Sequence, residues 1–472
     1  MDYLEAYRQA FAHLPSGAKE AEVNAETHRI TDIAVENGEM TKIETSEKTA
    51  LYVRVSGEKT GYVYTEDLEE DASQVLERAY ENSFCSNREK PEALNREAGN
   101  RSYETAEAIG EPETLNREAG NRSYETAEAI GEPEQLEGYA AAMEKELLEK
   151  SGIIQEVYVS LKAETVDQRT LNSYGLDAQC VTPLYIMRVT AGLREGEKNY
   201  TFSYLKSAKS PDAFQPEEFR RNLEAGLESQ KNPASGFVSG DYPVILSARV
   251  VCNLFITAWQ LFSGYKYAEK STALAGMLSK RLGKDVLNIT DYPEHPDSGF
   301  VMKYDCEGSE GKPVKLVENG IFTGLMTNAA SAQELGLPCT GNAGRRPLLF
   351  GNIATDILVT PKNFVIEPGT STVEELMEHM GDGVYITTSY DVFHTVNISS
   401  GDFSVPCKGT RIRDGKRAEN VTAISISGNL KDFFAQIEEV GNDLLITPME
   451  DLENYGIGAC SIRLRSCRVS GE

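Results

Sequence analysis

The chain has 472 residues, 40% hydrophobic and 26% charged, which is ordinary for a globular protein of two or three domains. Its formal net charge is −27, from 47 basic and 74 acidic residues. This balance argues against unaided binding to nucleic acid or anionic membranes, where clustered positive charge supplies most of the affinity. The start, MDYLEAYRQAFAHL, has no basic segment followed by an apolar one, so we expect no secretory signal and a cytoplasmic location.

The first 230 residues mix helical periodicity with the two-residue alternation of strands. The predicted elements are, in order, a helix capped by Asp2, a hairpin turning at 36–39, a hairpin turning at 56–60, a helix opened by a capping box of Asp67 and Glu70, a helix at 136–147, strands at 157–163, 184–190 and 200–205, and a helix at 216–230.

A 20-residue polar block interrupts this region. The sequence LNREAGNRSYETAEAIGEPE occupies Leu94–Glu113 and recurs letter for letter at Leu115–Glu134. Two copies are too few for a solenoid, which needs at least about three repeats. A tandem duplication and a sequence assembly error both explain the identity.

A boundary is predicted at 231–240, where small residues and turn formers gather. It divides the chain into an N-terminal α/β domain (1–235, with the insert at 94–134) and a C-terminal β-rich domain (236–472). The second domain is expected to begin with a buried strand and two helices, at 250–262 and 274–282. From about residue 286, short strands separated by Gly, Asn and Asp turns predict a curved antiparallel sheet or barrel. The expected fold class is therefore α+β.

Residues 250–262, VVCNLFITAWQLF, form the longest strongly apolar run and contain the only tryptophan. The run is too short to cross a bilayer, which takes about 20 apolar residues, so we predict a helix buried in a core. Asn253, Thr257 and Gln260 would form one narrow polar stripe on it. Amides and a hydroxyl can form hydrogen bonds, but they are not zinc ligands.

Several segments, taken in order, resemble the TldD/PmbA family, also called modulators of DNA gyrase. They are Val35-Glu-Asn-Gly, the hairpin at 53–63, Asn172-Ser-Tyr-Gly-Leu, Ser239-Gly-Asp-Tyr-Pro-Val, Leu316-Val-Glu-Asn-Gly, Cys339-Thr-Gly-Asn-Ala-Gly-Arg, Ile366-Glu-Pro-Gly, Ser400-Gly-Asp-Phe-Ser, Ile426-Ser-Gly-Asn-Leu and Val440-Gly-Asn-Asp.

The resemblance implies an N-terminal α/β domain, a β-rich C-terminal domain and a cytoplasmic, dimeric peptidase system. The TldD branch of the family carries a His-Glu-x-x-x-His zinc motif on a helix and a cysteine near the C-terminus. The corresponding helix here, 250–262, has neither His nor Glu. The chain therefore resembles the PmbA (TldE) branch, which implies a metal-free partner of a zinc-bearing subunit. Cys460 lies in the region of the family's cysteine, but its surroundings do not match that motif.

Some polar residues are candidates for binding contacts on their local chemistry alone. Among the five histidines, His394 precedes the Gly401-Asp402 turn, and this segment, with Asn397 and Asp402, is a candidate for contacts with a peptide or a partner. A histidine satisfied locally at a strand end is the alternative. Asn342 and Arg345 lie in a glycine-rich segment that is expected either to receive a peptide carboxylate or to form a turn bridged to acidic neighbours. Glu375 and His379, spaced i, i+4 on a predicted helix, are expected on an exposed polar face.

Three functions follow. The first is a non-catalytic subunit that holds peptides for a zinc-bearing TldD-like partner, with no cofactor in this chain. The second is a stand-alone metallopeptidase with unusual ligands such as His394, Asp402 and Cys460. The third is a non-enzymatic, peptide-binding homodimer. No nucleotide-binding loop and no Gly-x-Ser-x-Gly elbow is present in the sequence, so these chemistries have no support.

Overall fold

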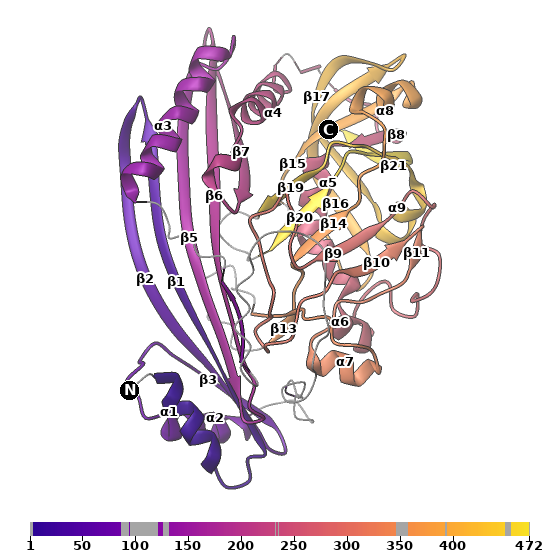
Figure 1. The fold of residues 1–472 in the computed structure, drawn as a ribbon. Coiled ribbons are helices and arrows are strands. Elements are labelled where there is room, and N and C mark those ends of the chain that lie inside the picture. The colour runs from indigo at the N-terminus through magenta and orange to yellow at the C-terminus, as the bar shows by residue number, and fades with distance from the viewer. Residues whose placement is uncertain are drawn as a thin grey trace.

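The computed structural model describes residues 3–85, 94, 121–125, 132–231, 233–234, 236–345, 357–391, 394–448 and 455–471. Two bodies stand side by side (Figure 1): a tall, curved sheet built from the first half of the chain, and a more compact β-rich body built from the second half. The chain passes from the first body to the second between Glu228 and Gly240, the segment in which the boundary was predicted.

The N-terminal body is a seven-stranded sheet in the order β3-β2-β1-β5-β6-β4, with β7 also pairing with β6. Its strands are β1 (Glu20–Glu36), β2 (Glu39–Ser56), β3 (Thr60–Thr65), β4 (Asn121–Glu125), β5 (Glu156–Asn172), β6 (Asp177–Glu195) and β7 (Lys198–Ala208). The first hairpin turns at Asn37 and Gly38, whose φ angles are 55° and 75°. Both predicted hairpins are confirmed, although the strands run much further than the sequence pattern indicated.

Helices cover this sheet at its two ends. They are α1 (Tyr3–Ala10), α2 (Ala72–Ser83), α3 (Pro133–Lys150) and α4 (Pro216–Glu228). The predicted opening of α2 at Asp67 is wrong: Asp71 is the N-cap, and its carboxylate accepts from the Gln74 amide. Glu70 instead pairs with Arg78. The expected Asp2 cap lies outside the described residues.

Part of the second copy of the duplicated block belongs to the fold. Its residues Asn121–Glu125 form β4, which pairs in parallel with β6, and Pro133 begins α3. In the first copy, Leu94 is described and is buried. The remaining residues of both copies lie outside the described part of the chain.

The C-terminal body contains a barrel. Its sheet has the order β17-β16-β15-β8-β21-β18, and β17 also pairs with β21, which closes the ring. The strands are β8 (Gly240–Leu246), β15 (Gly383–Ser389), β16 (Asp402–Arg413), β17 (Lys416–Asn429), β18 (Ile437–Val440) and β21 (Ile462–Gly471). The predicted α+β class, with a barrel-like second half, is confirmed.

A second sheet packs beside the barrel, in the order β11-β10-β9-β14-β20-β19. Its strands are β9 (Ile289–Tyr292), β10 (Val314–Glu318), β11 (Ile321–Phe322), β14 (Asn363–Ile366), β19 (Leu445–Pro448) and β20 (Gly456–Ala459), and a separate short pair joins β12 (Ala343–Gly344) to β13 (Leu358–Val359). The remaining helices are α6 (Gly264–Ala268), α7 (Ala329–Leu335), α8 (Val373–Met380) and α9 (Leu430–Gln436).

The predicted helix at 274–282 is wrong. The segment forms turns, because Gly276 and Ser279 have φ angles of 73° and 66°, which a right-handed helix cannot contain. Two of its backbone amides donate outside the segment, Ser279 to the Phe322 carbonyl and Leu282 to the Gly320 carbonyl, while those of Met277 and Lys280 form local turns with Leu274 and Met277. Pairing with the β10–β11 hairpin therefore replaces the helical hydrogen bonds.

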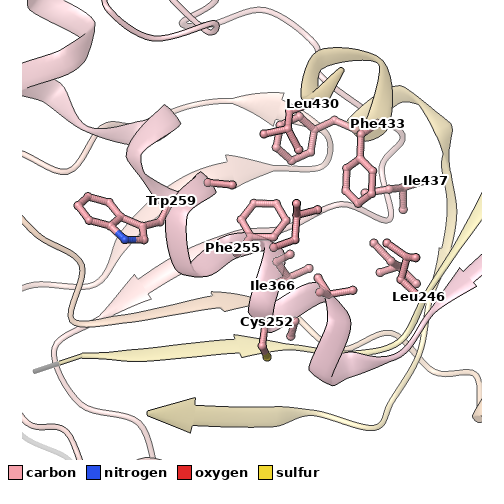
Figure 2. Packing of buried hydrophobic residues seen from close by; sticks show 14 of the residues in the cluster. Leu246, Cys252, Phe255, Trp259, Ile366, Leu430, Phe433 and Ile437 are labelled. Carbon is pink, nitrogen blue, oxygen red and sulfur yellow. The ribbon is translucent and has the colours of Figure 1, made fainter. Parts of the chain in front are cut away.

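The apolar run at 250–262 is a buried helix, as predicted. It forms α5 (Ala248–Ala258), which Ser247 caps, and continues as a 3-10 turn (Trp259–Phe262). Figure 2 shows Phe255 of α5 among side chains from α9 and the neighbouring strands, such as Phe433 and Ile366. Phe255 also stacks on Phe364 with ring centroids 5.5 Å apart. In the described part of the chain, every helix is too short or too polar to span a bilayer.

Candidate functional site

One side chain of the predicted polar stripe, Asn253, forms a hydrogen bond within the protein. Asn253 Nδ2 donates to Ser389 Oγ, at the end of β15, over 3.0 Å. Thr257 is buried and Gln260 is partly exposed. Amide and hydroxyl groups lack the thiolate, imidazole or carboxylate donors that zinc requires. The residues at this position therefore do not fit the zinc that the family's TldD branch implies.

Two cysteines lie beside α5 in the core. Cys252 Sγ donates to the carbonyls of Leu445 (3.4 Å) and Ile457 (3.3 Å), and burial raises its pKa to about 12. Cys460 is fully buried, and burial raises the pKa of its thiol as well. Both thiols are therefore protonated at neutral pH in the protein as it stands. Across the residues that the structure describes, no group of three or more His, Cys, Asp or Glu side chains is placed to hold a metal ion.

The segment around His394 is an exposed turn. The His394 side chain is 77% exposed, and its Nδ1 lies 2.7 Å from the Asp391 carboxylate. Asn397 Oδ1 accepts from the amides of Ser399 (3.0 Å) and Ser400 (3.1 Å), and the Asp402 carboxylate accepts from Asn429 Nδ2 at 2.9 Å. These local bonds shape the turn. The peptide or partner contacts proposed for His394, Asn397 and Asp402 stay predictions.

The glycine-rich segment lies between the two bodies. Arg345 donates to Asn24 Oδ1 (2.5 Å), lies 3.4 Å from the Glu26 carboxylate and stacks on Tyr52 at 4.2 Å. All three of these partners belong to the N-terminal sheet, so Arg345 joins the bodies.

Asn342 is fully buried, and its Nδ2 donates to Asp291 Oδ2 (2.7 Å) and to the Thr360 carbonyl (2.8 Å). The prediction that this segment is bridged to acidic neighbours is thus supported for Arg345 by its contact with Glu26. The carboxylate-binding role predicted for Asn342 and Arg345 stays untested.

Glu375 and His379 both lie on α8, but they contact different residues. Glu375 completes a capping box with Thr372, while His379 lies 3.0 Å from Glu439 and is 54% exposed. Both residues therefore lie on an exposed polar face of α8, as predicted.

A cleft of about 930 Å³ opens between the two bodies at the N-terminal end of α5. One wall is formed by β7 and α4. The other wall is formed by the first residues of α5, by α8 and by strands β15, β17 and β19. Side chains from both walls meet at Arg249, whose guanidinium lies 5.1 Å from the Phe202 ring and 5.4 Å from the Tyr204 ring.

Sequence reasoning missed Arg249. The signal in the sequence was Ser247, a typical N-cap residue directly before an apolar run. A helix that begins after Ser247 has Arg249 in its first turn. What the sequence could not supply was the opposite wall, because Phe202 and Tyr204 reach Arg249 through tertiary packing alone.

Comparison with known proteins identifies the family of this chain. Residues 239–471 match the PmbA/TldA metallopeptidase C-terminal domain, and residues 21–83 match PmbA/TldA metallopeptidase domain 1. The chain is similar to a zinc metalloprotease TldD homolog of Saccharolobus solfataricus, with 32% identity over 53% of this chain and 55% of that protein. It is also similar to the metalloprotease PmbA of Escherichia coli O157:H7, with 26% identity over 64% of this chain and 62% of that protein.

The matches therefore span between half and two thirds of the length of these curated relatives. The fold is similar over the whole chain to the crystal structure of TldE from Thermococcus kodakarensis, with a TM-score of 0.77 at 20% identity over 99% of this chain and 100% of that one. The matched domains and the shared fold agree, and the chain belongs to the PmbA/TldD metallopeptidase family.

Proposed function

We propose that this chain is a non-catalytic, peptide-holding subunit of a PmbA/TldD-type metallopeptidase and that it acts with a zinc-bearing, TldD-like partner in the cytoplasm. In this assembly the partner supplies the metal and the chemistry, while this chain helps to form the cavity that holds the peptide.

The observation that carries the proposal is the donor set on α5. Where the resemblance to the TldD branch implies a His-Glu-x-x-x-His motif, α5 has Asn253 and Thr257 and the following 3-10 turn has Gln260, and Asn253 is bonded to Ser389. Zinc hydrolysis needs about three convergent ligands and an open coordination position. Neither the stripe nor any other part of the described chain offers such a set.

The interdomain cleft supports the peptide-holding role. Its volume of about 930 Å³ suits a short peptide segment. Strand β7, which contributes Phe202, Tyr204 and Lys206 to the wall, pairs only with β6 among the described strands. An extended peptide can add to a strand edge of this kind through main-chain hydrogen bonds.

A stand-alone metallopeptidase using His394, Asp402 and Cys460 has less support. Cys460 is fully buried, whereas His394 and Asp402 are exposed and bonded to local neighbours. A peptide-binding homodimer needs no metal and is a second candidate that the same cleft would serve.

The proposal is tested by peptide hydrolysis with three samples: this chain alone, a TldD-like chain alone, and the two mixed. We expect activity only with the TldD-like chain present, and a higher rate in the mixture. A control mixture, in which the motif histidines of the TldD-like chain are changed to alanine, should be inactive. Activity in that control would contradict the proposal. Light scattering on each sample separates a heterodimer from a homodimer.

A further inference from the structure

The interdomain cleft is lined by three arginines without an ion pair in the described part of the chain, although the charge of one of them, Arg221, acts on Glu217 of the same helix. Arg249 is in the first turn of α5, Arg221 lies on α4 and Arg417 lies on β17, and all three line the cleft. None of the three forms an ion pair with another described residue. The cleft is lined by four basic residues (Lys206, Arg221, Arg249 and Arg417) and five acidic ones (Glu218, Glu228, Asp297, Glu374 and Asp443), so it is close to neutral in a chain whose net charge is −27.

Three of the other charged residues along the cleft are in ion pairs. Lys206 lies 2.5 Å from Glu218, and Glu228 lies 2.6 Å from Lys231. The Asp443 carboxylate accepts from the Ser461 amide (2.8 Å) and hydroxyl (2.7 Å). Two more acidic residues, Asp297 and Glu374, line the cleft without an ion pair to any of the three arginines. Among the described residues, none of these acidic side chains is paired with Arg249, so its guanidinium has no carboxylate counter-charge.

Arg249 is the most enclosed of the three. Burial lowers the pKa of its guanidinium, and among the described residues the ionisable groups that act on that pKa are Tyr204 and Cys252. Both are uncharged at neutral pH, because burial raises the pKa of the Tyr204 phenol and raises that of Cys252 to about 12. A desolvated charge without a counter-charge costs free energy, which an anionic ligand would offset.

The geometry around Arg249 suits a planar anion. A guanidinium that stacks on the rings of Phe202 and Tyr204 keeps its N–H groups in its own plane, where they can pair with both oxygens of a carboxylate. The residue also lies in the first turn of α5, an eleven-residue helix whose N-terminal end carries partial positive charge.

We propose that this cleft binds a carboxylate of the peptide, with Arg249 as its direct partner and Arg221 and Arg417 as flanking positive charges. The carboxylate is either an acidic side chain or the peptide's C-terminus. The inference rests on the proposed peptide-holding function and adds the class of peptide that the subunit selects.

The competing interpretation is that Arg249 only clamps the two bodies together through its aromatic contacts. Phe202→Leu separates the two roles, because it weakens the stacking and leaves the guanidinium in place. If Arg249 binds a carboxylate, Phe202→Leu retains most of the preference for anionic peptides and Arg249→Gln loses it. If it is a clamp, both variants lower stability and neither changes the preference.

The test is fluorescence anisotropy with labelled octapeptides at low salt, on the full chain. Three peptides are compared: alternating Glu and Ala with an amidated C-terminus, alternating Gln and Ala with an amidated C-terminus, and the Gln peptide with a free C-terminus. We expect one of the two carboxylate-bearing peptides to bind at least about ten-fold more tightly than the neutral peptide. Which one binds tightly identifies the source of the carboxylate.

Arg249→Gln should abolish this preference, and Arg249→Lys should restore only part of it, because an ammonium cannot pair in a bidentate way. The matched control is Arg413→Gln, which removes the same charge from an arginine that is 63% exposed and pairs with Glu419 outside the cleft. Its preference should equal that of the wild type. If Arg249→Gln does not fold, Arg417→Gln carries the test and should reduce the preference.

Equal binding of all three peptides would overturn the carboxylate inference and leave the peptide-holding function standing. Binding of none of them would overturn both. A preference that survives in Arg249→Gln and Arg417→Gln, or that falls equally in Arg413→Gln, would also overturn the assignment of these arginines.

Discussion

Asn253 of α5 donates a hydrogen bond of 3.0 Å to Ser389 at the end of β15. The bond joins the central helix to a barrel strand, at the helix in which the resemblance to the TldD branch implies a zinc motif. A side chain that could have faced a metal is thus committed to holding the barrel around its helix. Asn253 is therefore a structural residue of the C-terminal body.

The Asn253–Ser389 hydrogen bond should be measurable as a coupling free energy between substitutions at the two residues. We expect Asn253→Ala and Ser389→Ala each to lower the free energy of unfolding by about 1 kcal/mol, as is typical for a partly buried hydrogen bond. The double variant should cost less than the sum, with a coupling of about 0.5–1.5 kcal/mol. Urea denaturation measures all four proteins. Strict additivity would show that the bond contributes nothing to stability.

A buried ion group should hold the two bodies together. Arg54 of β2 is almost fully buried and lies 3.0 Å from both Glu22 and Glu307, the latter in the C-terminal body. Removing only the cation leaves two buried carboxylates, so we expect Arg54→Met to lower the free energy of unfolding by about 3–5 kcal/mol.

The triple variant Arg54→Met, Glu22→Gln, Glu307→Gln should recover much of that loss, because no uncompensated charge remains. Thermal denaturation compares both with the wild type. An Arg54→Met protein as stable as the wild type would show that the ion group does not contribute as described.

Stability should depend on pH through His28. Its Nδ1 lies 2.6 Å from Glu164, and hydrogen bonds to Glu164 and Glu26 raise the pKa of His28 to about 9. Burial opposes ionisation of Glu164, yet the bond to His28 holds the pKa of this carboxyl below its usual value.

Because the folded pKa of His28 lies above its unfolded value, its contribution is complete below about pH 6.5 and is lost as pH rises through about 9. The difference in unfolding free energy between the wild type and His28→Gln should therefore shrink by about 2 kcal/mol between pH 6 and pH 10. His13→Gln, at an exposed histidine, is the control. A difference that grows with pH would reverse the sign of this argument.

Local chemistry predicted part of the fold. The Asn-Gly turns at Asn37 and Asn319 were readable because a tight hairpin needs positive φ, and both residues adopt it. The buried helix at 250–262 followed from an apolar run. Closure of the barrel could not be predicted, because it depends on β17 pairing with β21 across residues remote in sequence. The same limit explains the wrong helix at 274–282, whose amides bond to a distant hairpin.

The site was less predictable than the fold. The stripe of Asn253, Thr257 and Gln260 followed from helical spacing, but its partner Ser389 comes from another element. The environment of Arg345 depends on Asn24 and Glu26 of the first strand, which no local pattern indicates. The cleft and its arginines arise only where the two bodies meet.

The zinc content of the purified chain alone tests the central claim most directly. The chain would be incubated with zinc, passed through a desalting column and analysed by mass spectrometry of the metal, with a TldD-like chain treated identically as the positive control. The account predicts far less than one zinc per chain here and about one per chain in the control. One zinc per chain that stays bound through desalting, and that is lost on replacing His394 or Cys460, would contradict it.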